Sequence, residues 1–281
     1  MAFPLLVAAA EWCPFEQEPT YGFFLRDQET IKAGGERTEL GASVAHVHPR
    51  LPAASAGLVP GDQVMLVNEK AVIEQRAEEV VQLVRKMTVA RIQPLKLDVM
   101  RAGDPHTFNM WAVPACQFTV QLIESYEING ITDGRRVGVT TGAMRFLRSD
   151  DELAWVVAHE IAHNVLNHSQ NARLRAMLNA FVGATMGASA ESSTEVPRRS
   201  FEARADYVGA YIMARAGYDV QAIKQFWHRI ERLQSGEENP EMDRTHPTTA
   251  ERLAAFEVTL KEIQEKRERG ESLQPVLEQL Q

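Results

Sequence analysis

The pattern of hydrophobic and polar positions predicts a β-rich first part of the chain and a largely helical second part. From about residue 21 to 113, apolar residues mostly alternate with polar ones, as in strands with one buried face. The run 95–99 is the clearest case, with Leu, Lys, Leu, Asp and Val in succession. Strands are expected over 43–48, 63–68, 95–99 and 108–112.

One segment of the first part has helical spacing instead. Apolar residues at positions 80, 81, 83, 84 and 87 predict a helix over 78–87. Two shorter signals lie before it. Ala53–Leu58 is expected to form a short helical turn containing Gly57, and Pro60–Asp62 to form a turn.

The second part begins with a small β-element near Cys116. Strands are expected over 118–123 and 137–140, with a turn at Asp133-Gly134 between them. Helical patterns dominate from residue 141 to the end, so this part is expected to be mainly α-helical.

A capping box marks the start of one of these helices. In the run Ser149–Glu152, the Ser149 hydroxyl can cap an amide while the Glu152 side chain returns to the Ser149 amide. The acidic first turn also suits the helix dipole. We therefore expect a helix to begin here and to continue through residue 163.

Three further segments have compositions that predict their role. Residues 188–200 are rich in Ser, Thr, Glu and Pro and are expected to form a mobile loop that gates access to a site. Residues 176–188 are apolar but shorter than the ~20 residues of a membrane span, which indicates a buried helix or a flap. Residues 250–271 are expected to form a charged amphipathic helix that packs on its own domain.

Composition and charge exclude some classes of function. The 281 residues are 44% hydrophobic and 24% charged, which indicates a globular protein with room for two modest domains. The net charge is −8, and the basic pair Arg198–Arg199 is too short to form a stripe, so nucleic acid is not expected as a partner. The apolar start, 3–10, lacks basic residues, so we expect any export signal to lie upstream of this chain.

The strongest chemical signal is an HExxH motif. His159 and His163 are four residues apart in the expected helix, so their imidazoles project from one face about one turn apart. That spacing lets both bind one Zn²⁺. Glu160, beside the first histidine, can act as a general base toward water.

The third metal ligand distinguishes the peptidase classes. The metzincin pattern HExxHxxGxxH fails, because Leu166 and Ser169 stand where it needs Gly and His. His168 is expected on the opposite helix face, as a surface or outer-layer residue. Glu202 and Asp206, at i and i+4, are better placed on a second helix.

Glu202 would complete a His₂Glu site, and Asp206 would accept a hydrogen bond from the outer nitrogen of a zinc histidine, most simply His159. The small residues around them, among which is Gly209, would let the two helices pack closely. Taken alone, an ExxxD pair is usually a solvated helix face.

The two cysteines, Cys13 and Cys116, lie far from the metal motif and on either side of the β-rich module. Neither belongs to a CxxC pair. A disulfide between them would close a loop of about 100 residues, nominally ~4–5 kcal/mol of chain entropy, and would imply an oxidising compartment. The alternative is two buried free thiols.

The β-rich module resembles a PDZ domain of the bacterial type. The resemblance rests mainly on Ser55–Asn68, SAGLVPGDQVMLVN, which is similar to the family signature AGLxxGDxIxxVN. It implies a peptide-binding groove between Ala42–His48 and the helix over Ala77–Met87, with a carboxylate-binding loop near Glu39–Ala42. The alternative is a spacer that binds nothing.

The second part resembles the gluzincin metallopeptidases of the HtpX, BepA and CAAX prenyl protease family. The segments that carry the likeness are Ile128–Gly130, Gly134–Gly142, Asp150–Ala154, His159–His163, Glu202–Asp206, Thr245–Pro247 and Glu251-Arg252. The resemblance implies that the strand at Asn129 and Gly130 pairs with the substrate backbone, and that His246 stabilises the oxyanion. Gly130 departs from the usual Ala. The membrane spans of some branches are missing, so the soluble exported branch is the more similar.

The sequence thus predicts an α+β fold with a PDZ-like β-rich module and a mainly α-helical gluzincin domain with a small edge sheet. The expected ranges are 1–20 for a segment packing on the catalytic domain, 21–115 for the PDZ-like domain and 116–281 for the peptidase domain. We expect an endopeptidase with one Zn²⁺ per chain that acts on misfolded or envelope proteins outside the cytoplasm, in the periplasm or associated with the envelope. A peptide-binding adaptor or holdase with a latent zinc site is the alternative, and an aminopeptidase a third.

Overall fold

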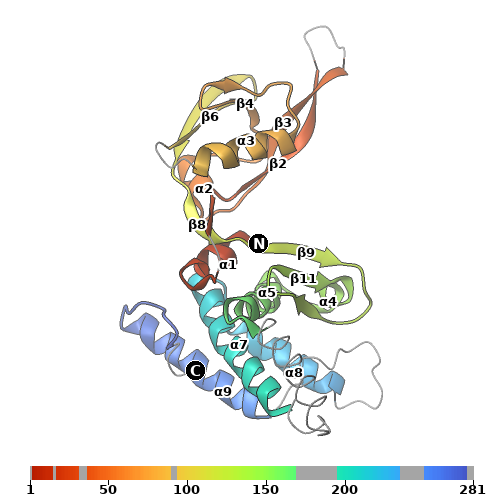
Figure 1. Ribbon diagram of the computed structural model, residues 1–281, viewed down its shortest axis with the longest axis vertical. Coiled ribbons are helices and arrows are strands. Elements are labelled where there is room, and N and C mark those ends of the chain that lie inside the picture. The colour runs from red at the N-terminus through yellow and green to blue at the C-terminus, as the bar shows by residue number, and fades with distance from the viewer. Residues whose placement is uncertain are drawn as a thin grey trace, which may run out of the picture. The chain divides into compact units, whose positions relative to one another are not determined.

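The chain forms two compact units (Figure 1). A computed structural model describes residues 2–14, 17–31, 37–89, 94–168, 195–234 and 250–276. One unit is Gln17–Ala115, and the other combines Met1–Glu16 with Cys116–Gln281. The first unit is therefore an insertion into the second. The predicted α+β class is confirmed, because the inserted unit is β-rich and the other is mainly helical.

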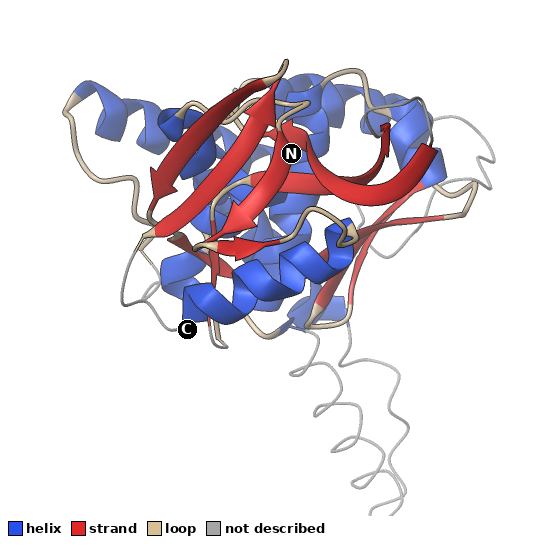
Figure 2. Cartoon of the chain, turned by 90° about the horizontal axis from the view of Figure 1, so that it is seen from above, coloured by secondary structure: helices blue, strands red, loops and turns tan. Residues whose placement is uncertain are grey.

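The inserted unit is built around one sheet whose strands follow the order β2-β3-β4-β6-β7, with β5 beside β4. Figure 2 shows the strands of the chain in red and its helices in blue. A separate pair joins β1 and β8. The bounds are β1 Gln17–Thr20, β2 Phe23–Ile31, β3 Arg37–Val47, α2 Pro52–Ala56, β4 Gln63–Val67, β5 Lys70–Ala71, α3 Ala77–Val89, β6 Leu95–Arg101, β7 Asp104–Met110 and β8 Val113–Cys116.

The predicted helical turn and the predicted helix of this unit are confirmed as α2 and α3. Gly57 ends α2 in the left-handed conformation, with φ of 94°. Helix α3 buries Val80 and Val84 in the core of the unit, and its first residue, Ala77, donates its amide to the Asp27 carboxylate of β2 at 2.7 Å.

The expected position of the peptide groove is wrong in one respect. Strand β3 contains the predicted groove strand Ala42–His48 except for its last residue, but it lies inside the sheet, paired with β2 on one side and β4 on the other. A strand can be added only at a sheet edge, where backbone groups are unpaired. Of the two edge strands of this sheet, β2 contacts α3, so a peptide that extends this sheet beside α3 would have to pair with β2.

The second unit consists of helices and a three-stranded sheet of order β10-β11-β9, which contacts α4 and α5. Strand β9 runs parallel to β11, and β10 runs antiparallel to it with Gly130 opposite Val139. The bounds are α1 Ala2–Ala8, η1 Ala10–Trp12, β9 Thr119–Ile123, β10 Gly130–Thr132, β11 Arg136–Thr140, α4 Thr141–Phe146, α5 Asp150–Val165, α7 Glu195–Arg215, α8 Ala222–Gln234 and α9 Ala250–Glu268.

The Ser149 cap of α5 is confirmed, since its hydroxyl accepts from the Glu152 amide at 3.2 Å. The other half of the capping box differs from the prediction. The Glu152 carboxylate accepts from the Arg148 amide at 2.8 Å and from Nη1 of Arg229 on α8, also at 2.8 Å. Both side chains of this ion pair are buried, so the carboxylate fixes α8 against the start of α5.

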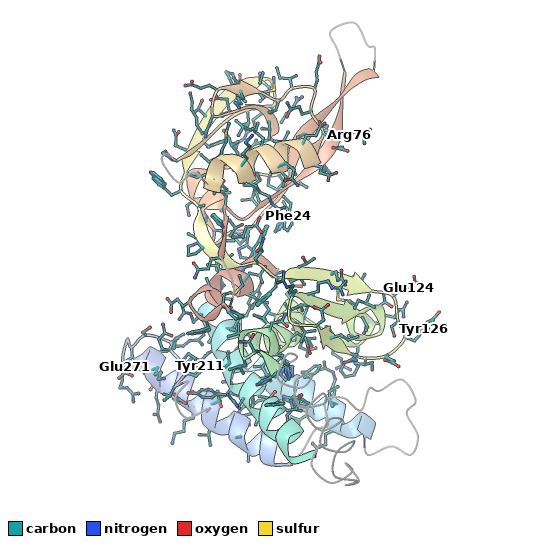
Figure 3. The ribbon with its side chains drawn as sticks, viewed as in Figure 1. Phe24, Arg76, Glu124, Tyr126, Tyr211 and Glu271 are labelled. Carbon is teal, nitrogen blue, oxygen red and sulfur yellow. A yellow bond between two sulfur atoms is a disulfide. The ribbon has the colours of Figure 1, made fainter. Side chains whose placement is uncertain are left out.

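Helices α5 and α7 pack at close range because Gly209 lies at their crossing. A Cβ at this position would lie 3.1 Å from the Cα of His159. Farther along α7, Tyr211 points toward α9, where its hydroxyl donates to Glu262 at 2.6 Å (Figure 3). Helix α7 is thus held between α5 and α9.

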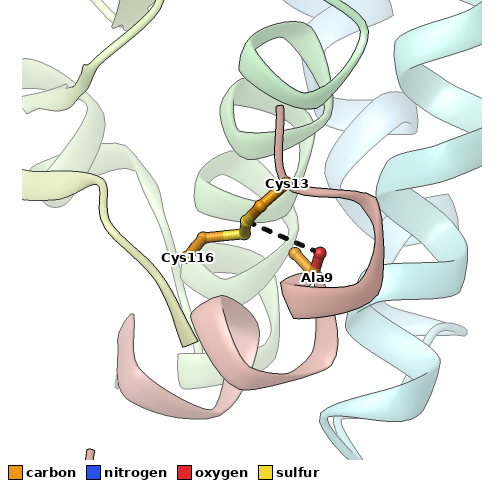
Figure 4. Close-up of a disulfide and its surroundings, with 3 residues drawn as sticks. All are labelled: Ala9, Cys13 and Cys116. Atoms are coloured by element: carbon orange, nitrogen blue, oxygen red, sulfur yellow. Dashed lines mark hydrogen bonds between the residues drawn. A yellow bond between two sulfur atoms is a disulfide. The ribbon is translucent and has the colours of Figure 1, made fainter. Parts of the chain in front are cut away.

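The predicted disulfide between Cys13 and Cys116 is present in the second unit, with the two Cα atoms 5.7 Å apart. It joins the segment after η1 to the end of β8, and Sγ of Cys13 lies 3.8 Å from the carbonyl oxygen of Ala9 (Figure 4). Helix α1, just before it, contacts both α5 and α7. The bridge therefore ties the first segment of the chain, which packs on α5 and α7, to the point where the second unit resumes at Cys116.

Helix α7 begins at Glu195, inside the range 188–200 that was expected to be a loop. The rest of that loop, the segment 176–188 and His246 lie outside the described residues. In the part of the chain that is described, no helix is both long and apolar enough to cross a membrane.

Candidate metal centre

Three side chains from two helices meet in the second unit. His159 and His163 project from α5, and their Nε2 atoms are 3.1 Å apart. The two carboxylate oxygens of Glu202 on α7 face one nitrogen each: Oε2 lies 3.4 Å from Nε2 of His159, and Oε1 lies 3.4 Å from Nε2 of His163. The three ligand atoms all lie within 4.8 Å of one another, and all three side chains are buried. Two imidazole nitrogens and a carboxylate oxygen are a donor set that fits zinc and leaves a coordination position open.

The electrostatics of this cluster also suit a cation. Burial by itself would lower the pKa of His159, but the Asp206 and Glu202 carboxylates raise it to about 10. Positive charge is therefore favoured at this point, even though the surroundings exclude water. A metal ion would satisfy the same carboxylates, with the imidazole neutral and bound through Nε2.

Asp206 holds the outer edge of the His159 ring. Its Oδ1 lies 3.1 Å from Nδ1 of His159, so in the neutral imidazole the carboxylate favours a proton on Nδ1, which leaves Nε2 to bind a metal. Burial would raise the pKa of the Asp206 carboxyl, but the Arg252 guanidinium and His159 lower it below its usual range. Asp206 is therefore ionised and orients the imidazole.

Arg252 is a residue of the site to which the sequence analysis gave no role. From α9 it donates Nε to Asp206 at 2.7 Å, and its Nη1 lies 3.2 Å from Glu202. Its guanidinium also lies over the ring of Trp227, 5.0 Å from the centroid. One buried cation thus pairs with the carboxylates of both Glu202 and Asp206. The sequence feature that could have indicated a role for Arg252 is its position shortly after the Thr245–Pro247 motif, within the segments that resemble the metallopeptidase family.

Glu160 lies on the side of the cluster that faces β10. It is 2% exposed, and a Cβ added at Gly130 would lie 2.8 Å from its Oε1. The departure from Ala at position 130 therefore leaves room for the Glu160 carboxylate. Asn129, Gly130, His159 and Glu160 line one pocket, whose empty volume, including the part open to solvent, is about 600 Å³.

Strand β10 forms one edge of the three-stranded sheet, because β11 is its only partner among the described strands. The carbonyl of Asn129, just before it, accepts from the Thr140 amide at 3.1 Å, which anchors the start of the strand to β11. The outer side of β10 lies next to the pocket and has the geometry of a sheet edge that can accept an added strand.

His168 lies closer to the metal cluster than the sequence analysis predicted. Helix α5 ends at Val165, and Asn167 adopts a left-handed conformation with φ of 55°. The chain therefore turns back, and helical periodicity no longer applies to His168. The residue is buried, and its Nδ1 lies 2.9 Å from Nδ1 of His163. It is an outer-layer residue and not a surface one.

Replacing His168 with phenylalanine is expected to weaken Zn²⁺ binding by about 10- to 100-fold. If Nε2 of His163 binds the metal, its Nδ1 carries a proton and needs the acceptor that His168 supplies. The phenyl ring keeps the stacking on Phe201, where the ring centroids are 4.5 Å apart. Competition with a chromophoric chelator measures the affinity.

Two further variants separate this role from packing. His168→Gln provides an amide oxygen as acceptor and is expected to recover most of the affinity. His228→Phe changes a histidine whose side chain is 72% exposed and should have no effect. Equal affinity in wild type and His168→Phe would contradict the role.

Comparison with known proteins assigns a family to this architecture. A family model described as Peptidase family M48 matches residues 106–259, and one described as PDZ domain matches residues 22–100. A search of curated proteins gives no match.

Two solved structures are similar to part of the chain. The PDZ domain of HtrA3 bound to a phage-derived ligand is 21% identical with a TM-score of 0.28, over 35% of this chain and 88% of that one. The HtrA-type protease AlgW with a decapeptide is 22% identical with a TM-score of 0.26, over 35% of this chain and 30% of that one.

The class of protein is therefore a metallopeptidase with a PDZ domain. The first match spans more than half of the 281 residues, and the chain belongs to Peptidase family M48. The resemblance to the HtpX and BepA family is thereby confirmed.

Proposed function

We propose that the chain is a zinc-dependent endopeptidase that hydrolyses peptide bonds of misfolded or envelope proteins. The observation that carries the proposal is the meeting of His159, His163 and Glu202 within 4.8 Å, beside a buried Glu160. These three side chains would hold the zinc ion. When bound, zinc supplies the Lewis acidity that polarises a scissile carbonyl and activates water.

Glu160 is the general base in this proposal. The Glu160 carboxylate lines the same pocket as His159 and Gly130. A peptide lying along β10 would therefore present a backbone carbonyl near both Glu160 and His159. Glu160 takes a proton from the attacking water and later delivers it to the leaving amine. Asp206 acts only through His159, whose ring orientation and tautomer it fixes.

Substrate binding uses the outer edge of β10. An extended peptide adds a strand there and pairs with the backbone from Asn129 onward, which fixes the scissile bond relative to Glu160. His246, proposed as an oxyanion donor on the basis of the family resemblance, would complete the site.

A second candidate function is a peptide-binding adaptor or holdase that uses the PDZ unit, with the metal site latent. The open edge of β2 beside α3 supports peptide binding in that unit. The buried Glu160 argues against a purely structural metal, which has no use for that carboxylate. The disulfide between Cys13 and Cys116 supports an extracytoplasmic location, such as the periplasm.

Cleavage of an unfolded protein, with and without a zinc chelator, tests the proposal. Chelator-sensitive cleavage that returns when Zn²⁺ is added is the expected result. A zinc-loaded chain that cleaves nothing would favour the adaptor function.

Removing the carboxylate of Glu202 is expected to remove most of the bound zinc, because two imidazoles alone leave the ion with half of a four-ligand site. Wild type and Glu202→Ala are dialysed, and their zinc content per chain is then measured and compared. Glu231→Ala changes a carboxylate on α8 whose side chain is 60% exposed, and it serves as the matched control. Full occupancy in Glu202→Ala would refute its role as a ligand.

A further inference from the structure

We propose that the pocket beside Glu160 is a specificity pocket that takes a large apolar side chain next to the scissile bond. This inference rests on the proposed peptidase function and names its substrate class. It predicts cleavage beside residues such as Leu, Met and Phe, and poor cleavage where Asp, Glu or Lys occupies that position.

The walls of the pocket come from four helices, α4, α5, α8 and α9, and from the residues at the start of β10. Helix α8 contributes aromatic and aliphatic side chains, α5 and the end of α4 contribute further apolar ones, and residues 128–130 form the side next to β10. The side chains used below are those of Leu147, Trp155, Val156, Phe226, Trp227 and Ile230. The empty space between these side chains, counted together with the part that is open to solvent, is about 600 Å³.

Few polar groups line this pocket. Among the described lining residues, the titratable ones are His159, Glu160 and Arg252. The guanidinium of Arg252 is already paired with the carboxylates of Glu202 and Asp206. Every other described lining side chain apart from Asn129 is apolar. A charged side chain entering the pocket would lose its hydration among these apolar walls, whereas an apolar one would gain burial. An acidic side chain would also meet the Glu160 carboxylate.

The position of the pocket relates it to the scissile bond. Gly130 belongs to β10, and both Gly130 and Glu160 line the pocket. Successive side chains of an extended peptide point to opposite faces of the sheet, so a peptide paired with β10 directs one of them toward the α5 side. Because the general base lines the same pocket, that side chain belongs to a residue flanking the bond that is cut.

The pocket walls are held in place by contacts with one another, so the pocket exists before a peptide enters. Trp227 packs edge-on against Phe226 at a centroid distance of 5.4 Å and against Trp155 at 6.4 Å. Arg252 covers the Trp227 ring, and Trp155 is also packed against Phe256 at 5.3 Å. A pocket preformed in this way selects by shape and polarity at little cost in ordering.

Mapping the cleavage sites in several unfolded proteins tests the inference even though the physiological substrate is unidentified. Product termini are read by mass spectrometry, and the residues at each position around the cut are compared with their frequency in the substrates. We expect enrichment of Leu, Met or Phe at one position next to the cut. In peptides that differ only there, Leu over Asp is expected to raise kcat/KM on the order of 10- to 100-fold. Absence of any apolar enrichment would overturn the inference.

A charge placed in the pocket wall should change that preference. Leu147 is a half-buried lining residue just after α4, so a carboxylate at this position can be accommodated. Leu147→Glu is expected to reduce kcat/KM for the Leu peptide at least about 10-fold and to favour a Lys peptide. Leu122→Glu makes the same change on β9 at a residue that is 63% exposed, and it should keep the wild-type preference. An unchanged preference in Leu147→Glu contradicts the inference.

A binding measurement separates failure of this inference from failure of the proposed function. Zinc-loaded Glu160→Gln protein is titrated calorimetrically with acetylated tetrapeptide amides that carry Leu or Asp at the position selected by the cleavage sites. If no cleavage is seen, Leu and Asp are placed in turn at each of the four positions of the peptide. Preferential binding of the Leu peptide, lost in the additional Leu147→Glu variant, supports the pocket even if the chain does not cleave. Equal binding of both peptides, or binding of neither, overturns it.

Discussion

Replacing Glu160 with glutamine is expected to abolish peptide cleavage while zinc binding stays intact. The amide has the shape of the carboxylate but cannot accept a proton from water, and general acid–base catalysis of this kind contributes about 10²- to 10⁴-fold. Glu160 is not one of the three clustered metal-binding side chains, so its replacement leaves the donor set complete. Initial cleavage rates, normalised to zinc content, give the comparison.

An isosteric replacement is needed because the side chain at position 160 is confined. It is 2% exposed, and the space between it and β10 exists only because residue 130 has no side chain. Glu124→Gln is the matched control, since this exposed carboxylate lies in the loop after β9 (Figure 3). A Glu160→Gln protein that retains a tenth or more of the wild-type rate would show that another group acts as the base.

Replacing Arg252 with methionine is expected to destabilise the second unit by about 3–5 kcal/mol. The side chain is 5% exposed and pairs with two buried carboxylates, those of Asp206 and Glu202. Removing the guanidinium leaves the two buried carboxylates with His159 as their remaining positive partner, and methionine replaces only the packing of Arg252 against Trp227. Urea unfolding of the metal-free protein, followed by tryptophan fluorescence, measures the loss.

Two comparisons identify the cause. Lys261→Met removes a cation from the same helix, but its side chain is 79% exposed and lies 3.8 Å from Glu265, so less than about 1 kcal/mol is expected. Adding Asp206→Asn to Arg252→Met should recover part of the stability, because one unpaired charge is then removed. If the losses of stability measured for Arg252→Met alone and Asp206→Asn alone simply add in the double variant, the buried ion pair does not explain the effect.

The local parts of this architecture could be predicted from the sequence because their signals are local. The i, i+4 spacing of His159 and His163 and the Ser149 cap both act within a few residues, and both occur in α5 as expected. The spacing also places their side chains on one face, next to Glu202.

The parts that could not be predicted depend on distant pairing or on one backbone conformation. Arg252 meets Asp206 across 46 residues, and Arg229 meets Glu152 across 77. His168 faces His163 because of the left-handed Asn167. The groove strand was misplaced because alternation identifies a strand but does not tell whether it lies at a sheet edge.

The insertion of one unit into the other has a consequence for biosynthesis. The helical unit is interrupted after Glu16 and resumes at Cys116. Close to these two points, the bridged residues Cys13 and Cys116 hold their Cα atoms 5.7 Å apart. During synthesis the inserted unit is complete before α5 and α7 emerge, so it can fold first. Helix α1 can pack only later, when α5 and α7, the helices that it contacts, have been synthesised. Because the two points of attachment are adjacent, the insert can be shortened, lengthened or exchanged in evolution without displacing the helices that carry the proposed metal ligands.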